Sequence, residues 1–376
     1  MRIAVIHSFY RSAVSSGENN TVLAQVEALR GAGHEVELIA QYTDENRKRN
    51  PLYPLKAGFD VATGNGYDPT PELEKFQPDV VWVHNLFPNF ATQWLGNWKG
   101  PILASLYNYR SVCANGSLFR NGQPCTKCPD GQAWAGLRHR CYRNSFFASL
   151  PLVLQTSRHL QGNPIFQNAK KLIVISTDSW TKFRAFGAPV DRLTVLPSFI
   201  EVPERKLRHR PRNTRWLVAG RLSAEKGLVE LVKIWPEEFL LDIYGDGPNF
   251  SQIQQCAGES VELKGIVSQD QLHSIMSQYR GLVFYSLAAE TQGLIAAEAA
   301  ALGLSTVALR GTIVGTALEA VDPRATFLSN TESLRKSLVH VSRNPNCEKI
   351  VPRLLWTRRQ WLTSAEEILS EFAQTR

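Results

Sequence analysis

The chain has 376 residues, more than one hydrophobic core usually holds, and this length predicts two domains of similar size. Hydrophobic residues make up 43% and charged residues 20%, which excludes a disordered or fibrous protein. The longest apolar runs, such as residues 146–154, fall well short of the roughly 20 residues that span a bilayer, and no secretory signal follows MRIAVI. We therefore expect a cytoplasmic protein, and peripheral contact with the inner face of the plasma membrane stays open.

The formal net charge of +8 indicates anionic partners. Much of this excess lies in a Pro- and Arg-rich stretch, residues 198–215, which we interpret as a linker between domains. Its basic residues are Arg205, Lys206, Arg208, Arg210, Arg212 and Arg215. A solvated linker explains the run as well as a binding patch does. Nucleic acid is not expected, because no recognition module accompanies the run, whereas an anionic lipid surface and a phosphorylated substrate both fit.

The first half alternates strands and helices in the manner of a parallel α/β sheet. Predicted strands cover residues 2–6, 35–40, 79–85, 102–107, 171–176 and 193–197. A loop with Gly17 follows the first strand but lacks the GxGxxG motif, which argues against a dinucleotide-dependent dehydrogenase. Ligands of open parallel sheets bind outside the carboxyl ends of the strands. A candidate cleft therefore receives the polar residues at two of these ends, which are His84, Asn85, Tyr107, Asn108 and Arg110. For His84 a purely structural role is an equal alternative.

Two segments of the first half carry weaker signals. Residues 41–76 are expected to be mostly loop, with one short helix at 70–76. Residues 146–160 are predicted to be a helix, and the apolar face of 146–154 serves either core packing or contact with a membrane. Core packing is the simpler interpretation.

An insertion at residues 111–145 holds four of the six cysteines: Cys113, Cys125, Cys128 and Cys141. The central CTKC has the spacing of a metal knuckle, and four thiolates suit a tetrahedral structural zinc ion. The outer spacings are long and irregular, so independent, uncoordinated cysteines are the equal alternative. A redox-active pair is not expected, because this CxxC lacks the strand and helix of a thioredoxin-type site.

The second half restarts the pattern of strand and helix, and three polar segments follow its predicted strands. They are GRLSAEKG (220–227), YGDGP (244–248) and ETQGLIAAE (290–298). In the last segment, Gly293 stands at a predicted helix start, where free N–H groups favour an anion. Glu290 precedes that start and Glu298 lies inside the helix. This arrangement predicts a ligand-binding site in which an anion lies at the helix start with acidic side chains around it, and it leaves the ligand open.

The three segments, in this order and spacing, resemble the retaining glycosyltransferases of family 4, and the resemblance covers nearly the whole chain. In the first half it includes PDVVWVHNLFP (78–88) and LYNYRSVCANGSLFRNGQPC (106–125), which are similar to a subgroup that builds bacterial surface polysaccharides. The resemblance implies the GT-B fold, an α/β architecture of two Rossmann-like, doubly wound parallel-sheet domains that face a cleft. It implies an acceptor-side domain at residues 1–200, completed by a C-terminal helix at 357–376, and a donor-binding domain at 201–356.

The resemblance also implies roles for individual residues. Arg221 and Lys226 would bind the donor diphosphate and, with Glu290, serve catalysis, because guanidinium and ammonium groups offset charge on a leaving phosphate. Glu290 would bond hydroxyls of the donor sugar, and Glu298 those of the ribose. The full implied donor set is Gly17, Gly220, Arg221, Lys226, Gly265, Ile266, Glu290, Thr291, Gln292, Gly293, Leu294 and Glu298. His84, Asn85, Tyr107 and Arg110 would face the acceptor or the transferred sugar.

The sequence departs from the family pattern at two places. Thr291 and Gln292 stand where members usually carry a phenylalanine, and Tyr107 stands where many carry a histidine. We expect transfer of a hexose-type sugar from a UDP- or GDP-linked donor to a glycan or polyprenyl-linked acceptor, with no catalytic metal and no cofactor. The alternatives are a weak or inactive homologue that acts as a binding subunit, and a nucleotide-sugar epimerase on the same fold.

Overall fold

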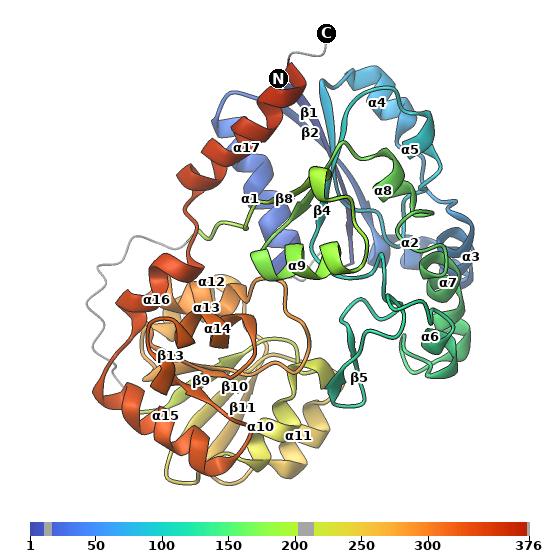
Figure 1. The fold of residues 1–376 in the computed structure, drawn as a ribbon. Helices are drawn as coiled ribbons and strands as arrows, with labels where there is room; N and C mark the ends of the chain where they lie inside the picture. The colour runs from blue at the N-terminus through green and yellow to red at the C-terminus, as the bar shows by residue number, and fades with distance from the viewer. Residues whose placement is uncertain (11–16, 202–213, 374–376) are drawn as a thin grey trace. The chain divides into compact units, whose positions relative to one another are not determined.

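The computed structural model describes residues 1–10, 17–201 and 214–373 and divides the chain into two compact units. Unit 1 comprises Met1–Leu118, Cys125–Ser198 and Arg358–Arg376. Unit 2 comprises Phe119–Pro124 and Phe199–Thr357. Each unit contains a six-stranded sheet whose paired strands are all parallel, with helices in the connections (Figure 1). The predicted architecture of two parallel α/β domains is confirmed.

The sheet of unit 1 has the strand order β2-β1-β3-β4-β7-β8. These strands are β1 (Arg2–Phe9), β2 (Glu35–Tyr42), β3 (Val80–Asn85), β4 (Ile102–Leu106), β7 (Lys171–Val174) and β8 (Leu193–Val195). The helices of the unit are α1 (Gly17–Gly31), α2 (Thr43–Arg49), α3 (Tyr53–Thr63), α4 (Thr70–Phe76), α5 (Trp94–Asn97), α6 (Ala135–Arg138), α7 (Phe146–Thr156), α8 (Pro164–Asn168), α9 (Thr177–Ala185), η1 (Val190–Arg192) and α17 (Arg358–Ala373). The inner strands are nearly continuous apolar runs and are buried, as a sheet with helices on both faces requires.

Helix α17 returns to the sheet of unit 1 at the end of the chain (Figure 1). Its Trp361 is fully buried and stacks on Trp82 of β3, with 5.9 Å between the ring centroids. Stacking of two large rings buries much apolar area and adds an orientation-dependent attraction. The aromatic pair therefore anchors the last helix to the sheet.

The expectation of a mostly irregular segment at residues 41–76 is wrong, because helices α2 and α3 lie within it. Sequence patterning missed α3 because its apolar stripe, Leu52, Leu55 and Phe59, points to solvent instead of the core. The buried side of the helix carries Tyr53 and Asp60, so the pattern does not read as an ordinary amphipathic helix.

The sheet of unit 2 has the strand order β11-β10-β9-β12-β13-β14. These strands are β9 (Trp216–Ala219), β10 (Leu241–Tyr244), β11 (Val261–Gly265), β12 (Gly281–Phe284), β13 (Thr306–Leu309) and β14 (Thr326–Phe327). The helices are η2 (Ala224–Lys226), α10 (Leu228–Lys233), α11 (Phe250–Cys256), α12 (Gln269–Met276), α13 (Leu294–Ala301), α14 (Ile313–Glu319), η3 (Pro323–Ala325), α15 (Thr331–Arg343) and α16 (Cys347–Leu354). A short antiparallel hairpin, β5 (Phe119–Arg120) with β6 (Gln123–Pro124), groups with this unit.

Glycines let two loops of unit 2 approach each other closely. A Cβ atom on Gly245 would lie 1.9 Å from the carbonyl oxygen of Gly220, and one on Gly247 would lie 2.3 Å from that of Leu222. The amide of Leu222 donates to the carbonyl of Asp246 at 3.0 Å. The GDGP segment therefore needs glycine at both positions, because any side chain there would collide with the backbone of the GRLS segment.

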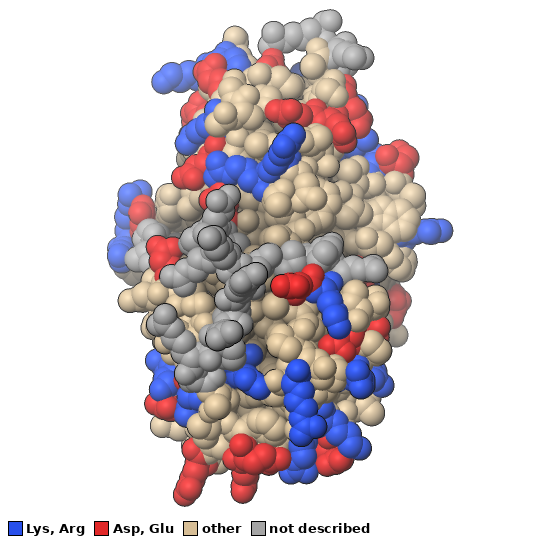
Figure 2. Space-filling model, turned by 90° about the vertical axis from the view of Figure 1, so that its left-hand side faces the viewer, with Lys and Arg blue, Asp and Glu red and all other residues tan. Residues whose placement is uncertain are grey.

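Two observations concern the charged residues of the chain. Of the basic stretch at the predicted linker, Arg215 is described, and it bonds Asp242 and Glu262 in unit 2; the residues Arg205, Lys206, Arg208, Arg210 and Arg212 lie outside the described residues. Figure 2 shows Lys and Arg side chains interspersed with Asp and Glu over the face that it draws. Within the described part of the chain, no helix is both long and apolar enough to cross a bilayer.

Candidate functional site

The sheet of unit 2 reverses its winding between β9 and β12, which are neighbours although the strands β10 and β11 lie between them in the chain. Loops that leave the carboxyl ends of two such strands diverge and open a crevice, which is the usual ligand site of doubly wound sheets. The loop after β9 is GRLSAEK (220–226), and the loop after β12 is YSLAAETQG (285–293). Two of the three predicted donor segments therefore flank the same switch point.

Backbone hydrogen bonds join these two loops. The amides of Leu287 and Ala288 both donate to the carbonyl oxygen of Glu225, at 2.9 and 3.2 Å. A Cβ on Gly227 would collide with Leu287 and Tyr285, at 2.6 and 2.7 Å from their side-chain atoms. The second loop is thus held against the first, which fixes the positions of the charged side chains that both carry.

Lys226 and Glu290 meet across the two loops as an ion pair. The hydroxyl of Ser286 also donates to Oε1 of Glu290, at 2.8 Å. Burial pushes the pKa of Glu290 upward, but the charge of Lys226 and the two hydrogen bonds outweigh it, so the pKa lies below its ordinary value. Glu290 is therefore an anion at neutral pH, and Lys226 is its counter-ion.

Gly293 ends the loop after β12, and helix α13 begins at the next residue. Gly293 has φ 76° and precedes the first residue of α13, and a Cβ there would lie 2.7 Å from Val314. Gln292 is buried beside it, and Thr291 is partly buried. Glycine is thus required for both the left-handed backbone and the close packing, and it leaves the first amides of α13 without a bulky residue in front of them.

Glu298 lies on α13 and faces a different partner from Glu290. Its Oε1 accepts from Nε2 of Gln269 at 3.0 Å, and its Oε2 lies 3.5 Å from Nε2 of His273; both partners belong to α12. The two glutamates of the E-x7-E pattern therefore have separate surroundings, one in the β9–β12 crevice and one against α12.

The remaining predicted donor residues of this unit are more dispersed. Arg221 is exposed in the loop after β9. Gly265 ends β11, the edge strand, and Ile266 follows it, so β10 and β9 separate both residues from β12. Gly265 accepts a hydrogen bond from the amide of Gly245 at 2.8 Å, and the side chain of Ile266 is 65% exposed. An exposed isoleucine after a strand end offers an apolar face to a flat ligand group.

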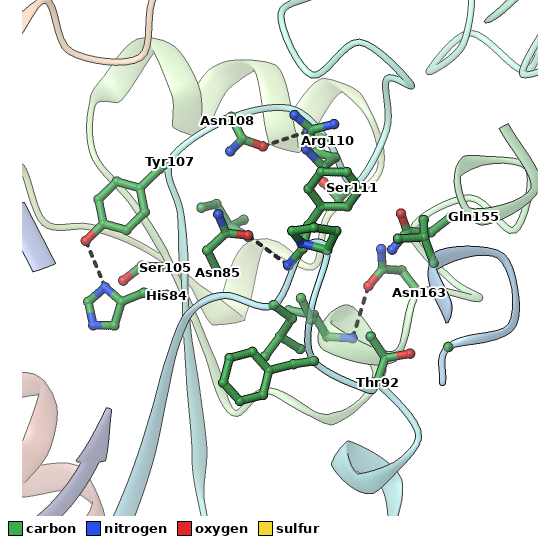
Figure 3. Close-up of a pocket in the computed structure, with 18 of the residues that line it drawn as sticks. His84, Asn85, Thr92, Ser105, Tyr107, Asn108, Arg110, Ser111, Gln155 and Asn163 are labelled. Carbon is green, nitrogen blue, oxygen red and sulfur yellow. Dashed lines mark hydrogen bonds between the residues drawn. The ribbon is translucent and has the colours of Figure 1, made fainter. Parts of the chain in front are cut away.

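Unit 1 has an equivalent switch point between β1 and β3, and a pocket with a cavity of about 90 Å³ opens beside it (Figure 3). Its lining includes all four residues predicted to face the acceptor: His84, Asn85, Tyr107 and Arg110. Helices α3 and α7 close the pocket with Asp60 and Gln155, among other residues. A cavity of this volume, far smaller than the several hundred Å³ of a whole-ligand pocket, holds one chemical group of a ligand.

A hydrogen-bonded chain holds His84 and Tyr107 in the wall of this pocket (Figure 3). Nδ1 of His84 lies 2.9 Å from the hydroxyl of Tyr107, which donates to Oε1 of Gln25 at 3.1 Å. The hydroxyl of Tyr107 can join His84 and Gln25 in one chain because a hydroxyl both donates and accepts hydrogen bonds. Burial drives the pKa of His84 far below its ordinary value, and burial raises that of Tyr107, so both are neutral near pH 7.

A carboxylate that the sequence did not single out lies at the same place. Asn85 Nδ2 donates to Oε1 of Glu18 at 2.9 Å. Burial raises the pKa of Glu18, against the opposing effects of the Asn85 hydrogen bond and the charge of Arg110. Glu18 directly follows Gly17 in the first turn of α1. Its position just after the glycine of the first loop is the signal that could have identified it.

Arg110 is held over the aromatic faces of this region. Its guanidinium carbon lies 4.2 Å from the ring centroid of Phe87 and 5.6 Å from that of Tyr142. Three buried polar atoms of the pocket lining have no hydrogen-bond partner within the described residues: Nη1 of Arg110, Oγ of Ser111 and Oε1 of Gln155. Buried polar groups are nearly always satisfied, so a polar ligand or water is the expected partner of these atoms.

His7 is a second buried histidine near this pocket. Its Nε2 lies 3.0 Å from Oδ1 of Asn19, and its ring centroid is 6.5 Å from that of His84. Burial lowers the pKa of His7 to about 4, so it adds no charge at neutral pH. His7 gave no signal in the sequence, because it directly follows the predicted apolar strand at residues 2–6 and belongs to no motif.

The four cysteines of the insertion lie near one another without forming a metal site. Cys113 and Cys128 are buried, and all four are free thiols. Burial, with smaller effects of Cys113 and Cys141, raises the pKa of Cys128 to about 12. Over residues 1–10, 17–201 and 214–373, no group of three or more His, Cys, Asp or Glu side chains is placed to hold a metal ion. The arrangement therefore lends the zinc hypothesis no support, and zinc binding stays a prediction.

Comparisons with known proteins give a family match within unit 2 and structural matches over the whole chain. Residues 213–343 match the family model described as glycosyl transferases group 1. A search of the curated proteins returned no match. The matched segment includes both loops of the β9–β12 crevice as well as α13.

Solved structures match the chain over its full length at low identity. Sucrose-phosphate synthase from Thermosynechococcus elongatus has a TM-score of 0.68 at 16% identity, with 100% of both chains covered. HepE from Anabaena, in complex with UDP and glucose, has a TM-score of 0.61 at 13% identity, with 99% of this chain and 100% of that chain covered. The lipopolysaccharide outer core galactosyltransferase WaaB has a TM-score of 0.56 at 14% identity over the same shares. The fold is GT-B, and the family match together with this fold supports a glycosyltransferase.

Proposed function

We propose that the protein is a retaining glycosyltransferase of family 4 that transfers a sugar from a nucleotide-diphosphate donor to a glycan or polyprenyl-linked acceptor in bacterial surface-polysaccharide synthesis. The observation that carries the proposal is the Lys226–Glu290 ion pair, which joins the two loops at the switch point of the unit 2 sheet. It combines a cation for phosphate with a carboxylate for hydroxyl groups in one crevice. Several of the similar structures contain UDP or UDP-glucose, which agrees with a donor of this class.

The donor diphosphate would lie where α13 begins. There the amides after Gly293 point at it, and Lys226 and Arg221 contribute positive charge. Because Lys226 is already paired with Glu290, phosphate binding would shift the lysine from the carboxylate toward the diphosphate. The released carboxylate would then accept hydrogen bonds from hydroxyls of the donor sugar.

Catalysis would consist of positioning and of stabilising the departing diphosphate. The C–O bond to the phosphate breaks, its electron pair goes to the diphosphate oxygen, and the acceptor oxygen attacks the same face of the sugar. The proton of the acceptor would pass to the leaving phosphate oxygen, so no strong side-chain base is required. The charges of Lys226 and Arg221 would make a divalent metal unnecessary.

The nucleoside and the first domain would supply the other contacts. Glu298 would accept from the ribose hydroxyls, and Gly265 with Ile266 would face the base; Gly220, Thr291, Gln292 and Leu294 complete the crevice, and Gly17 would let the loop of unit 1 approach the phosphates. The pocket of unit 1 would hold the reacting end of the acceptor or the transferred sugar. Its unpaired Arg110, Ser111 and Gln155 atoms are suited to hydroxyl or carboxylate groups of a glycan.

Tyr107, which stands where many family members carry a histidine, bears on the choice between an active enzyme and a binding subunit. Its hydroxyl is engaged with His84 and Gln25, and burial keeps it protonated, so it can donate or accept a hydrogen bond but cannot serve as a base. Since the proposed mechanism uses no base at this position, replacement of histidine by tyrosine is compatible with activity. The proposed location is the cytoplasm, at the inner face of the plasma membrane.

The test is a panel of UDP- and GDP-sugars against the purified chain, read by thermal shift and by release of nucleotide with and without acceptor glycans. A donor that binds should raise the melting temperature by mass action. The variant Arg221→Ala should lower the transfer rate by about 10²-fold or more, because a group that stabilises leaving-group charge is lost.

Arg324→Ala is the matched control, since Arg324 is another exposed arginine of unit 2, at η3 beside β14. Equal rates for Arg221→Ala and Arg324→Ala would refute the assignment of Arg221. Nucleotide binding without turnover would favour the binding subunit, and nucleotide release that needs no acceptor would favour the epimerase.

A further inference from the structure

Three adjacent helices of unit 1 expose large apolar side chains. These residues are Leu52, Leu55 and Phe59 at α3, Trp134 at the start of α6, and Phe146 and Phe147 at the start of α7. We call this set the α3–α6–α7 surface. Phe147 is 84% exposed and Leu55 is 74% exposed, values that leave almost no part of either side chain in the core. Single exposed apolar residues need no explanation, but a group of six on adjacent helices does.

Packing contacts hold the three helices together, with α7 in the middle (Figure 1). A Cβ on Gly58 of α3 would lie 3.5 Å from Pro151 of α7, and one on Gly136 of α6 would lie 2.9 Å from Val153 of α7. At the far end of α7, Arg158 donates to the carbonyl of Ala62 at 3.1 Å. The α3–α6–α7 surface is thus built on a packed helical layer.

The apolar side chains of α3 form a regular stripe. Leu52, Leu55 and Phe59 follow the i, i+3, i+7 spacing that places residues on one face of a helix. On the other side of the same helix, Tyr53 and Asp60 are buried. The helix therefore presents one face to unit 1 and an apolar face to solvent, which is the pattern of a helix with a missing partner.

In the part of the surface that contains α6 and α7, the chain carries charges of one sign. Residues 131–177 contain four arginines and two lysines but no aspartate or glutamate. Arg138, Arg140 and Arg143 follow Trp134 and precede Phe146, and all three are exposed. By contrast, the face drawn in Figure 2 mixes both signs. Exposed rings flanked by uncompensated arginines match the chemistry of a bilayer, with an apolar interior beneath anionic headgroups.

We propose that the α3–α6–α7 surface docks the protein on a membrane that contains anionic lipids, with the aromatic side chains inserted below the headgroups and the arginines among the phosphates. A second copy of the chain is a poorer occupant, because a two-fold contact pairs this surface with itself and would bring the arginines of both copies into one interface. Helices α3 and α7 also line the unit 1 pocket through Asp60 and Gln155. Docking would therefore bring that pocket close to lipid-linked molecules.

The test is flotation of the full-length protein with vesicles of phosphatidylglycerol and phosphatidylcholine in equal parts, compared with vesicles of phosphatidylcholine alone. We expect binding to the anionic vesicles that weakens as salt is raised. Phe147→Ser should lower the partition coefficient roughly tenfold, because most of a phenyl ring loses its apolar surroundings. Gln substitutions at Arg138, Arg140 and Arg143 should each lower it about fivefold on anionic vesicles alone.

Val190→Ser is the matched control, since Val190 is a 49% exposed apolar residue of unit 1 outside the surface. Absence of wild-type binding to anionic vesicles, or equal binding by Phe147→Ser and Val190→Ser, would overturn the proposal. So would a dimer in solution that Phe147→Ser dissociates, because the surface would then be an interface between copies. The inference extends the proposed function but has its own readout: transfer with a water-soluble acceptor and no vesicles should be unchanged in Phe147→Ser.

Discussion

The Lys226–Glu290 pair permits a prediction that separates its structural role from its role in binding. In Lys226→Met, Glu290 loses its counter-ion in a site where burial already opposes its charge. Removing one partner of a fully buried ion pair costs about 3–5 kcal/mol. The side chains of Lys226 and Glu290 are 31% and 19% exposed, so water screens the remaining charge. We therefore expect Lys226→Met to lower the free energy of unfolding by about 2 kcal/mol at pH 7.

The double variant Lys226→Met/Glu290→Gln removes the stranded charge and should unfold within about 1 kcal/mol of the wild type in urea. It should not recover affinity for UDP or GDP in calorimetry, because phosphate binding would need the lysine itself. Unchanged stability of Lys226→Met would show that the pair stabilises nothing. Recovery of nucleotide binding in the double variant would refute a direct contact between Lys226 and the diphosphate.

The Lys226–Glu290 pair should make the free energy of unfolding depend on pH, and the sign of this dependence follows from the lowered pKa of Glu290. A carboxylate with a lowered folded-state pKa stabilises the fold above its unfolded pKa, and the effect is lost as pH falls through the folded pKa. The stability difference between the wild type and Lys226→Met should therefore be full at pH 7 and should shrink below the ordinary value of 4.5. A difference that stays constant down to pH 3 would contradict an ionic interaction.

The remaining predictions concern stability and thiol chemistry. Trp361→Ala should lower the free energy of unfolding in urea by about 3–5 kcal/mol, because it removes a fully buried indole. A clearly smaller loss would contradict the anchoring role of this side chain. Gly245→Ala should fold poorly or lose several degrees of melting temperature because of backbone collision, whereas Gly258→Ala, with nothing within 4 Å of its Cβ, should not; equal melting curves would refute the collision argument. In metal-free protein at pH 8, Cys128, whose pKa is raised to about 12, should be alkylated more slowly than Cys125 in peptide mass spectra. Stoichiometric zinc in purified protein, with protection of both thiols, would instead support the zinc hypothesis.

Much of the fold followed from local patterns. Apolar runs of four to six residues between polar segments marked most strands, because a strand covered on both faces must be apolar throughout. Residues at the strand ends were also predictable as candidates for function, since all parallel strands deliver their carboxyl ends to one edge. His84, Asn85, Tyr107 and Arg110 indeed line one pocket.

Other features had no local signal. Helix α3 was not predicted because an apolar stripe at helical spacing is expected to face the core. In this helix the stripe of Leu52, Leu55 and Phe59 faces solvent. Glu18 was overlooked because its partner Asn85 is 67 residues away in the chain. The close spacing of Cys125 and Cys128 suggested a metal knuckle, yet ligand geometry depends on all four thiols, and two of those come from elsewhere in the insertion.

The sequence by itself determined the strands and most of the helices of this protein, their order and the chemistry at the ends of the strands, because these depend on propensity and burial over a few neighbouring residues. Only the tertiary structure decided which groups meet. It paired Lys226 with Glu290 across 64 positions, turned Glu298 toward α12, and linked Tyr107 to both His84 and Gln25. Such pairings depend on strand order and on helix packing. Both are set by burial of the whole sheet and not by any single segment.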